Sequence, residues 1–461
     1  MNINNTLCCL NVGLPEDIQR RKNYGDFDGA IRLIDRRLAD EATPEAMRNA
    51  LLAQKEICRR LPEDFPYSRE EAIALVREHI SDFTEEEFDE LVDDRRIRWI
   101  YINGEMRFFD RFFSSVCKAM PSFAHRAGMQ LSGVESDTGI PQEKDLLDVT
   151  IEKMKENGSL SYRIRVRASV RLKDEQFSPG MFIRAHLPIP APCPQQTDIC
   201  IEKLFPENGR IAPEDAPQRT ICWEETMEEN HAFVVEYSYL HTARYHDAYH
   251  GTGKPASLTC DIREQEPHIV FTPYIRALCD KLTEGMTDPL EKARAFYDFI
   301  TLNMQYTYMP SYFVLERIAE SCAQSFTGDC GVFALLFITL CRCAGIPAQW
   351  QSGLTAEPDY IGCHDWARFY AEPYGWLFAD PSYGIAAVRK NKEYRRRFYF
   401  GNLDPFRMVA NSAFQEDFTV SKEHWRSDPY DNQSGEIETA DRGFRSEEYV
   451  RTKEILLCEE V

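Results

Sequence analysis

One apolar run near the middle of the chain sets the strongest constraint on its fold. Residues 332–344 read VFALLFITLCRCA and are apolar on nearly every side of a helix. This pattern is typical of a helix that is buried inside a domain. Gly345 follows as the residue that ends such a helix, and Pro347 prevents its continuation. The run therefore predicts a helix that other elements enclose and that ends at a defined point.

Cys330 comes directly before this helix, between Gly328 and Gly331. Free N–H groups and the positive end of the dipole at a helix N-terminus favour the thiolate, which is the nucleophilic form of cysteine. The two glycines allow close approach of another backbone. We therefore expect the pKa of Cys330 to lie below the ~8.5 of a free cysteine and Cys330 to be the most reactive of the 15 cysteines. Cys341 and Cys343, inside the helix, are interpreted as small buried apolar residues.

Two short strands downstream supply partners for this thiol. Residues 363–370 and 376–380 predict an antiparallel hairpin, which Pro381 ends. The start of the first strand and the end of the second lie at the same end of such a hairpin. Any loop with an odd number of residues places His364 and Asp380 on one face of it. A five-residue loop would set Asp380 opposite Trp366 and diagonal to His364, within reach of a side-chain contact.

These elements together resemble the transglutaminase-like core of the papain-like superfamily, in its multidomain bacterial form. The resemblance covers residues 289–384 and is carried, in order, by Gly328-Asp329-Cys330 with its helix, Ala344-Gly345-Ile346-Pro347-Ala348, His364-Asp365-Trp366 and Trp376-Leu377-Phe378-Ala379-Asp380-Pro381. It implies that Cys330 is the nucleophile, that His364 is the general base and acid, and that Asp380 orients the imidazole. It also implies an α+β fold with a central helix packed on an antiparallel sheet.

The resemblance further implies an oxyanion hole, made by the backbone N–H of Cys330 and an upstream side chain. Tyr306 lies where the family often carries an aromatic residue and is the candidate for that side chain, with Gln305 as the alternate. Residues 400–408 resemble a substrate-side or packing loop of bacterial members.

The predicted activity is cysteine-dependent acyl transfer on a peptide, protein or isopeptide amide, through a thioester acyl-enzyme. The first prediction is release by water, which would make the protein a peptidase or amidase. The alternative is capture by an amine, which would make it a protein-glutamine transglutaminase. The sequence does not separate these two acceptors. A non-catalytic scaffold is the third hypothesis, and the presence of all three triad residue types speaks against it. We expect no cofactor and no metal site, because the histidines at 241, 246 and 250 share no cysteine or acidic ligand at a matching spacing.

A long strand is predicted upstream of the core. Residues 160–172 alternate strictly between apolar and polar side chains, as a strand does when one face is buried and the other is wet. The arginines of this strand could bind an acidic ligand, but a solvated sheet face is the favoured interpretation. Further strands at 181–187, 219–223 and 232–240 predict an antiparallel sandwich.

Helices and one hairpin make up the N-terminal part. Residues 16–62 predict a pair of amphipathic helices, and no second copy indicates a solenoid. Ser68 with Glu71, and Thr84 with Glu87, are capping boxes that open two more helices, and Asn103-Gly104 predicts a type I′ hairpin. Two helices and a hairpin resemble a winged helix, which we interpret as a packing module.

The predicted organisation has five parts: a helical hairpin at 1–62, a winged-helix-like module at 63–135, a β-rich sandwich-like domain at 145–262, the transglutaminase-like core at 268–400, and a C-terminal extension at 401–461 that packs on the core.

Charge and cysteine content limit the expected partners and location. Lys and Arg number 54 against 75 Asp and Glu, and this net charge of −21 argues against nucleic acid or an anionic membrane as partner. The first 19 residues show no secretory signal, and the longest apolar stretch is half of the ~20 residues that a membrane span needs. Scattered cysteines suit reduced thiols. We therefore expect a cytoplasmic protein that acts on an amide substrate, and the oligomeric state stays open.

Overall fold

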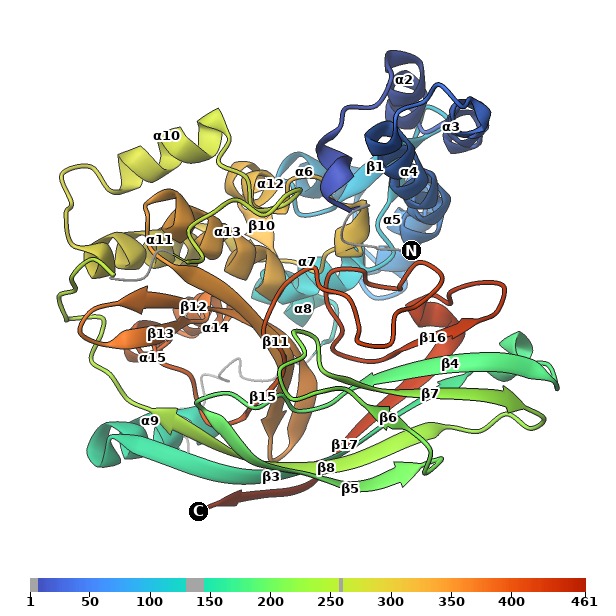
Figure 1. The fold of residues 1–461 in the computed structure, drawn as a ribbon. Coiled ribbons are helices and arrows are strands. Elements are labelled where there is room, and N and C mark those ends of the chain that lie inside the picture. The colour runs from blue at the N-terminus through green and yellow to red at the C-terminus, as the bar shows by residue number, and fades with distance from the viewer. Residues whose placement is uncertain (1–6, 130–144, 257–259) are drawn as a thin grey trace.

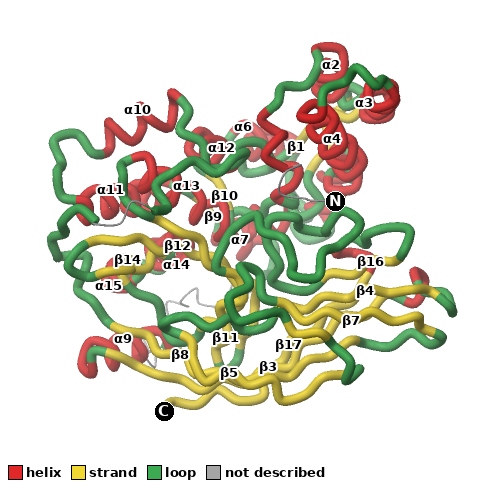
Figure 2. Tube along the Cα trace, in the orientation of Figure 1, coloured by secondary structure: helices red, strands yellow, loops and turns green. Residues whose placement is uncertain are grey.

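The computed structural model describes residues 7–129, 145–256 and 260–461 of the chain. It is a mixed α and β structure, in which most of the helices lie above the core sheet and the sandwich lies below it in the view of Figures 1 and 2. Residues 1–6 and 130–135, at the outer ends of two predicted domains, and residues 257–259, inside a third, lie outside the described residues. In the described part, no helix is both long enough and apolar enough to cross a membrane.

The N-terminal part begins with a short 3-10 helix and continues with three helices where a pair was predicted. These elements are η1 (Cys9–Asn11), α2 (Glu16–Tyr24), α3 (Phe27–Ala39) and α4 (Glu45–Asp64). The additional break arises at Gly25, whose φ of 81° ends α2. Asp26 then caps α3, since its side chain accepts a hydrogen bond from the Gly29 N–H.

The winged-helix-like module contains the predicted helices and hairpin. Its elements are α5 (Arg69–Arg77), α6 (Glu85–Asp93), β1 (Trp99–Ile102), β2 (Glu105–Phe108), α7 (Phe112–Ala119) and α8 (Pro121–Arg126). Both capping boxes form. Asn103 and Gly104 have φ values of 51° and 83°, the positive values that a type I′ turn requires. The hairpin prediction is confirmed.

The sandwich consists of two four-stranded antiparallel sheets. One sheet has the order β17-β3-β8-β5 and the other β16-β4-β7-β6. The strands are β3 (Ser159–Leu172), β4 (Met181–Pro188), β5 (Gln196–Phe205), β6 (Arg210–Ile211), β7 (Thr220–Met227), β8 (Phe233–Arg244), β16 (Glu436–Thr439) and β17 (Tyr449–Glu460). Before β3 lies the helix α9 (Leu146–Asn157), and the 3-10 helices η2 (Asp174–Gln176) and η4 (Ser446–Glu448) precede β4 and β17.

The alternation predicted for the first of these strands is observed. Ile164 and Val166 of β3 face the other sheet and are fully buried with Trp223. The arginines on the outer face are paired with acids, for example Arg167 with Glu236 at 2.9 Å. They therefore form a solvated, charge-paired sheet face.

The C-terminal residues pair more widely than predicted. Besides lying against the core, they supply β16 to one sheet of the sandwich and β17 to the other. Residues near the C-terminus therefore complete the sandwich, because β16 pairs with β4 and β17 pairs with β3.

The core has a five-stranded antiparallel sheet of order β14-β13-β12-β11-β15, with helices against it. The strands are β11 (Ala348–Glu357), β12 (Tyr360–Ala371), β13 (Gly375–Ala379), β14 (Phe400–Gly401) and β15 (Arg407–Asn411), with a separate parallel pair, β9 (Gln305–Tyr306) and β10 (Thr327–Gly328). The helices are α10 (Pro273–Leu282), α11 (Pro289–Asn303), η3 (Tyr312–Val314), α12 (Ile318–Ser325), α13 (Cys330–Cys343), α14 (Pro381–Arg389) and α15 (Glu393–Phe398).

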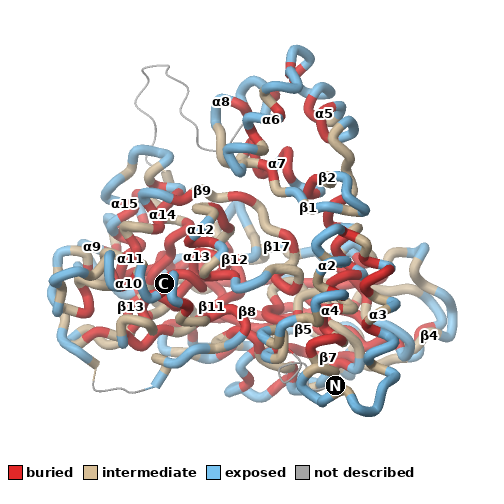
Figure 3. The backbone as a smooth tube through the Cα atoms, turned by 90° about the horizontal axis from the view of Figure 1, so that it is seen from above, coloured by how far each residue is buried: buried red, intermediate tan, exposed pale blue. Residues whose placement is uncertain are grey.

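The helix α13 is the predicted central helix. All residues from Gly331 to Cys341 are buried in it, and buried residues gather along α13 and the strands beside it (Figure 3). The Phe337 ring packs against that of Phe369 in β12, with 5.5 Å between centroids. This packing holds the middle of α13 beside β12.

Strands β12 and β13 pair in the register that the sequence predicted. Ala367 pairs with Ala379 and Ala371 with Gly375, so the next position sets Asp380 opposite Trp366. The turn leaves three residues unpaired instead of five, which keeps the parity of the two strands unchanged.

Candidate active site

The N-terminus of α13 is held by a half-buried carboxylate and a tyrosine. The Asp329 side chain caps the helix by accepting a hydrogen bond of 3.2 Å from the Val332 N–H. The Tyr312 hydroxyl donates to the same Asp329 oxygen at 2.5 Å. Burial raises the pKa of Asp329. Cys330 follows at the first turn with a half-buried side chain.

The thiol of Cys330 has a carboxyl group as its partner. Its Sγ donates a hydrogen bond to Oδ2 of Asp365 at 3.1 Å. Burial, followed by the charges of Asp365 and Asp329, raises the pKa of Cys330 well above its ordinary value. The expected lowering by the helix N-terminus is therefore wrong, because desolvation and two carboxyl groups outweigh the dipole. In this arrangement Cys330 is a thiol.

Asp365, in β12, contacts polar side chains of the C-terminal segment. The Gln433 amide donates to its Oδ1 atom. Burial raises the pKa of Asp365 well above its ordinary value, and the neighbouring carboxyls of Asp431 and Asp329 add to that effect. Asp431 is held in turn by the Ser352 hydroxyl at 2.6 Å. Gln433, 68 positions downstream of Asp365 in the sequence, thus helps to fix the carboxyl that contacts the thiol.

His364 and Asp380 form a second buried pair. Nε2 of His364 lies 2.7 Å from Oδ2 of Asp380, with exposed fractions of 6% and 0% for the two residues. Asp380 also caps α14, since its Oδ1 accepts from the Tyr383 N–H at 3.0 Å. Burial opposes ionisation of Asp380, yet His364 and Arg407 lower its pKa to about 2. Burial lowers the pKa of His364, against the opposing effect of Asp380.

The structure therefore brings together two of the three predicted triad residues. In the described residues, no hydrogen bond or ion pair joins Cys330 to His364 or to Asp380. The reason lies in β12, where neighbouring side chains point to opposite faces. Asp365 shares a face with Phe369, which packs on α13, whereas His364 shares a face with Trp366. The complete triad stays a prediction.

The two oxyanion candidates lie in β9, which pairs with the strand just before Cys330. Tyr306 pairs with Gly328. The Tyr306 ring lies 6.3 Å, between ring centres, from that of Phe333, which is in the first turn of the helix that Cys330 begins. Burial raises the pKa of Tyr306. Gln305 instead accepts a hydrogen bond from the Arg96 guanidinium. Tyr306 is therefore the better placed of the two, and its oxyanion role stays a prediction.

Sequence reasoning missed four groups around these residues: Asp365, Gln433, Arg407 and Asp404. The alternation of β12 was a usable signal for Asp365, since one of two adjacent residues has to face α13. Gln433 and Arg407 come from distant segments, and no local pattern announced their contacts.

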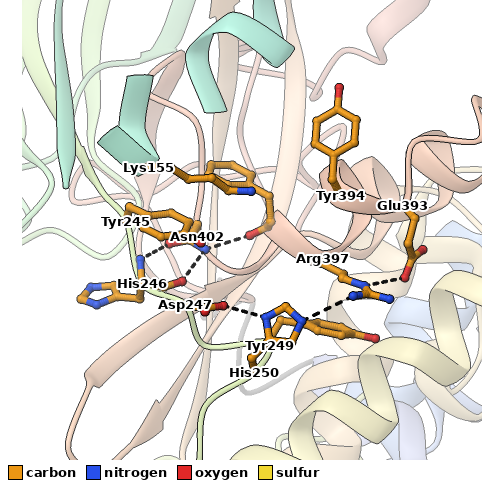
Figure 4. Close-up of a pocket in the computed structure, with 11 residues that line it drawn as sticks. Lys155, Tyr245, His246, Asp247, Tyr249, His250, Glu393, Tyr394, Arg397 and Asn402 are labelled. Atoms are coloured by element: carbon orange, nitrogen blue, oxygen red, sulfur yellow. Dashed lines mark hydrogen bonds and ion pairs between the residues drawn. The ribbon is translucent and has the colours of Figure 1, made fainter. Parts of the chain in front are cut away.

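A separate pocket of about 330 Å³ lies between α9, residues 245–250 and α15 (Figure 4). Its lining includes His246 and His250, but neither Cys330 nor the His364–Asp380 pair. His250 contacts Asp247 and Arg397 there. Among the described residues, no group of three or more metal-ligating side chains is arranged to hold a metal ion.

The core matches a known superfamily. Residues 276–381 match the Transglutaminase-like superfamily, so this part of the chain is a transglutaminase-like domain. The chain is 26% identical over 130 residues to the uncharacterized protein YebA of Bacillus subtilis, a match of 24% of this chain and 18% of YebA. It is 27% identical over 128 residues to a protein-glutamine gamma-glutamyltransferase of Pseudomonas aeruginosa, covering 25% of this chain and 19% of the relative. The chain therefore spans under a fifth of the length of these relatives.

Two solved structures resemble parts of the fold. A cysteine protease candidate from Cytophaga hutchinsonii is 14% identical, with a TM-score of 0.44, over 66% of this chain and 91% of that one. The periplasmic domain of TgpA from Pseudomonas aeruginosa is 14% identical, with a TM-score of 0.29, over 57% of this chain and 99% of that one.

Proposed function

We propose that this protein catalyses cysteine-dependent acyl transfer on a peptide or protein amide, with Cys330 as nucleophile. His364 acts as general base and acid, and Asp380 orients its imidazole. The observation that supports this most directly is the 2.7 Å contact between two buried residues, Asp380 and His364 of β12, the strand that packs on the Cys330 helix through its other face. The Asp380 carboxylate fixes the orientation of the His364 ring, and it stabilises the imidazolium that forms when His364 takes a proton.

The described arrangement corresponds to a resting state in this proposal. The Cys330 thiol is protonated and bonded to Asp365. That hydrogen bond has to break, and His364 has to gain access to the thiol, before the proton can move from sulfur to the imidazole. Substrate binding over the thiol is the event that we assign to this change, because it would displace the polar contacts of Asp365.

The chemical steps then follow in order. The Cys330 thiolate attacks the amide carbonyl carbon, and the oxyanion that forms is stabilised by the α13 N-terminus. Collapse breaks the carbon–nitrogen bond, and the imidazolium of His364 gives its proton to the leaving amine. The thioester that remains on Cys330 reacts with water, deprotonated by His364, to release a carboxylic acid. We take water as the acceptor.

An amine acceptor is the second candidate, and one observation favours it. The chain is 27% identical over 128 residues to a protein-glutamine gamma-glutamyltransferase of Pseudomonas aeruginosa. In that case a primary amine attacks the same thioester and forms a new amide.

The test is to trap and then resolve the acyl-enzyme. The full-length protein is incubated with an activated ester of a blocked glutamine peptide, and intact mass and peptide mapping locate the adduct. An acyl group on Cys330, absent in Cys330→Ser, is the expected result. Chasing the trapped species in ¹⁸O-labelled water, with and without a primary amine, separates hydrolysis from transfer. Acylation elsewhere, or an equal yield from Cys330→Ser, would overturn the proposal.

A further inference from the structure

An arginine lies directly behind the His364–Asp380 pair. Nη1 of Arg407 is 3.0 Å from the same Asp380 oxygen that contacts His364. Nη2 of Arg407 is 2.6 Å from Oδ2 of Asp404. The side chains of Arg407, Asp380 and Asp404 are all completely buried. The four residues form one continuous chain of contacts: His364, Asp380, Arg407, Asp404.

The sheet register explains why Arg407 reaches this position. Thr355 of β11 pairs with Arg407 on one side and with Gly362 on the other. Paired residues share a face of the sheet, and so do residues two apart in a strand. Arg407 therefore stands on the same face as His364. The side chain at position 407 thus determines the charge that lies next to the His364–Asp380 pair.

Asp404 is itself fixed in place. Its Oδ1 accepts a hydrogen bond of 3.0 Å from the Phe406 N–H, and the Tyr399 hydroxyl donates to its Oδ2 at 3.0 Å. The Arg407 guanidinium also lies 4.3 Å from the centre of the Tyr383 ring. With a hydroxyl, a backbone N–H and a ring holding it, the Arg407–Asp404 pair has little freedom to move away from Asp380.

The charges of this chain balance in only one protonation state of His364. Asp380 and Asp404 contribute two negative charges and Arg407 one positive charge. With neutral His364 the buried group carries −1, and with the imidazolium it carries zero. A buried net charge costs free energy that a paired one does not. The arrangement therefore stabilises the imidazolium, the state in which His364 holds the proton of the nucleophile.

We propose that Arg407 and Asp404 are positioning residues that act through Asp380: Arg407 keeps Asp380 aimed at His364, and Asp404 sets the charge balance that favours protonated His364. This inference rests on the proposed role of His364 in acyl transfer. It assigns a role to the segment 400–408, because burying the charges of Asp404 and Arg407 costs desolvation free energy that packing alone does not require.

Other titratable groups near this chain belong to several elements. They are Tyr383 of α14, Tyr399 after α15, Glu357 of β11 and His241 of β8. Tyr383 lies 5.0 Å from the His364 ring, between ring centres. Glu357 accepts a hydrogen bond from the Tyr383 hydroxyl at 3.2 Å, so Tyr383 lies between Glu357 and His364 in this set of contacts. Asp380, the group in direct contact with His364, is unchanged in every variant compared below.

The test uses two variants whose effects have opposite signs. Arg407→Met removes a positive charge and should raise the pKa of His364, whereas Asp404→Asn removes a negative charge and should lower it. Each change should move the midpoint by about one pH unit, the size that a close charge produces. A merely structural role for the two residues would lower stability in both variants without opposite shifts. The double variant restores the original charge sum, so its midpoint should return towards that of the parent.

The measurement does not depend on activity. The His364 ring is titrated by NMR in a Cys330→Ala background, where Cys330 chemistry is absent, and its signals are identified by their loss in His364→Gln. The acidic limb of the pH–rate profile for acylation is measured in parallel with Cys330 present. Identical His364 midpoints in folded single variants, or shifts of the same sign, would overturn the positioning role.

Failure of the proposed function would look different. In that case the parent protein would not acylate at all, while the NMR midpoints would still report the effect of Arg407 and Asp404. If Arg407→Met does not fold, Arg407→Lys serves instead: it keeps the charge and loses the paired contacts to Asp380 and Asp404. The His364 midpoint should then stay near that of the parent while the plateau rate of acylation falls, and a lysine variant with the parent's rate would contradict the role in aiming Asp380.

Discussion

Cys330 and Asp365 are joined by a hydrogen bond of 3.1 Å between the thiol and a buried carboxyl group. This contact gives the thiol a different environment from the one that its place at a helix N-terminus suggests. A thiol beside one basic group is activated, whereas a thiol beside two acidic groups is kept protonated. The reactivity of Cys330 at rest is therefore set more by Asp365 and Asp329 than by the helix.

The first prediction concerns Asp365→Asn. This change keeps the side-chain shape and removes one cause of the raised pKa of Cys330, so the thiolate fraction at pH 7.5 should rise. One pKa unit corresponds to about a tenfold change in that fraction, and we expect a several-fold faster reaction with iodoacetamide. The rate is measured by peptide mapping of Cys330. Asp359→Asn, at an exposed position of the turn between β11 and β12, is the control, and an unchanged rate in Asp365→Asn would contradict the prediction.

The second prediction orders the triad by single-turnover acylation. Cys330→Ala should abolish the acyl-enzyme, because it removes the proposed nucleophile. His364→Ala should slow acylation by about 10²–10⁴-fold, the usual contribution of general acid–base catalysis. Asp380→Ala should cost less, since Asp380 only orients the ring, as the third residue of the subtilisin triad also costs less.

Circular dichroism provides the control for these variants, since each one has to be folded for its rate to count. A folded His364→Ala protein that acylates at the parent rate would show that Asp365, the group in contact with the thiol, takes the proton instead.

Much of the fold follows from local sequence patterns. The all-apolar run of α13, the alternation of β3 and the Asn103-Gly104 turn each predict their element, because the spacing of apolar residues and the turn chemistry are local properties. The hairpin of β12 and β13 was predicted in its correct register for the same reason. The number of helices before residue 65 was not, because Gly25 breaks a pattern that apolar spacing alone leaves continuous.

The site was harder to predict than the fold, because its electrostatics depend on distant segments. The contacts of Asp365 with Gln433, and of Asp380 with Arg407, join residues that no spacing rule connects. Burial is the main cause of the raised pKa of Cys330, and burial is a property of the folded chain. The pattern of residue types therefore predicted His364 and Asp380 as neighbours, but not what surrounds Cys330.

The third prediction concerns the stability that Asp380 contributes. Its pKa is about 2 in the folded protein, below that of a free aspartate. Its stabilising effect is therefore complete above about pH 4 and is lost as the pH falls towards 2. Asp380→Asn should lower the free energy of unfolding by about 2 kcal/mol at pH 7, because Arg407 is left with one carboxylate partner fewer.

Urea unfolding at pH 7 and at pH 3 measures this effect. The difference between Asp380→Asn and the parent should shrink at the lower pH, and the exposed control Asp359→Asn should differ from the parent at neither. A difference of the same size at both values would mean that the cost comes from packing and not from charge.

The last prediction concerns Asp428, in the C-terminal segment that contacts Asp365. Burial and the neighbouring Asp431 raise its pKa to about 7, although its Oδ1 accepts a hydrogen bond of 2.9 Å from the Tyr430 N–H. The unfolded chain releases this proton near pH 4, whereas the folded protein keeps it until about pH 7, so the folded state loses stability as the pH rises between these values.

Asp428→Asn keeps the accepting oxygen and cannot ionise. It should therefore match the parent near pH 4 and be more stable at pH 8, by about 2 kcal/mol once the partial exposure of the side chain is allowed for. Urea unfolding at the two pH values measures this difference, with Asp359→Asn as the control. A variant that is less stable than the parent at pH 8 would show that Asp428 is ionised and favourably paired in the folded protein.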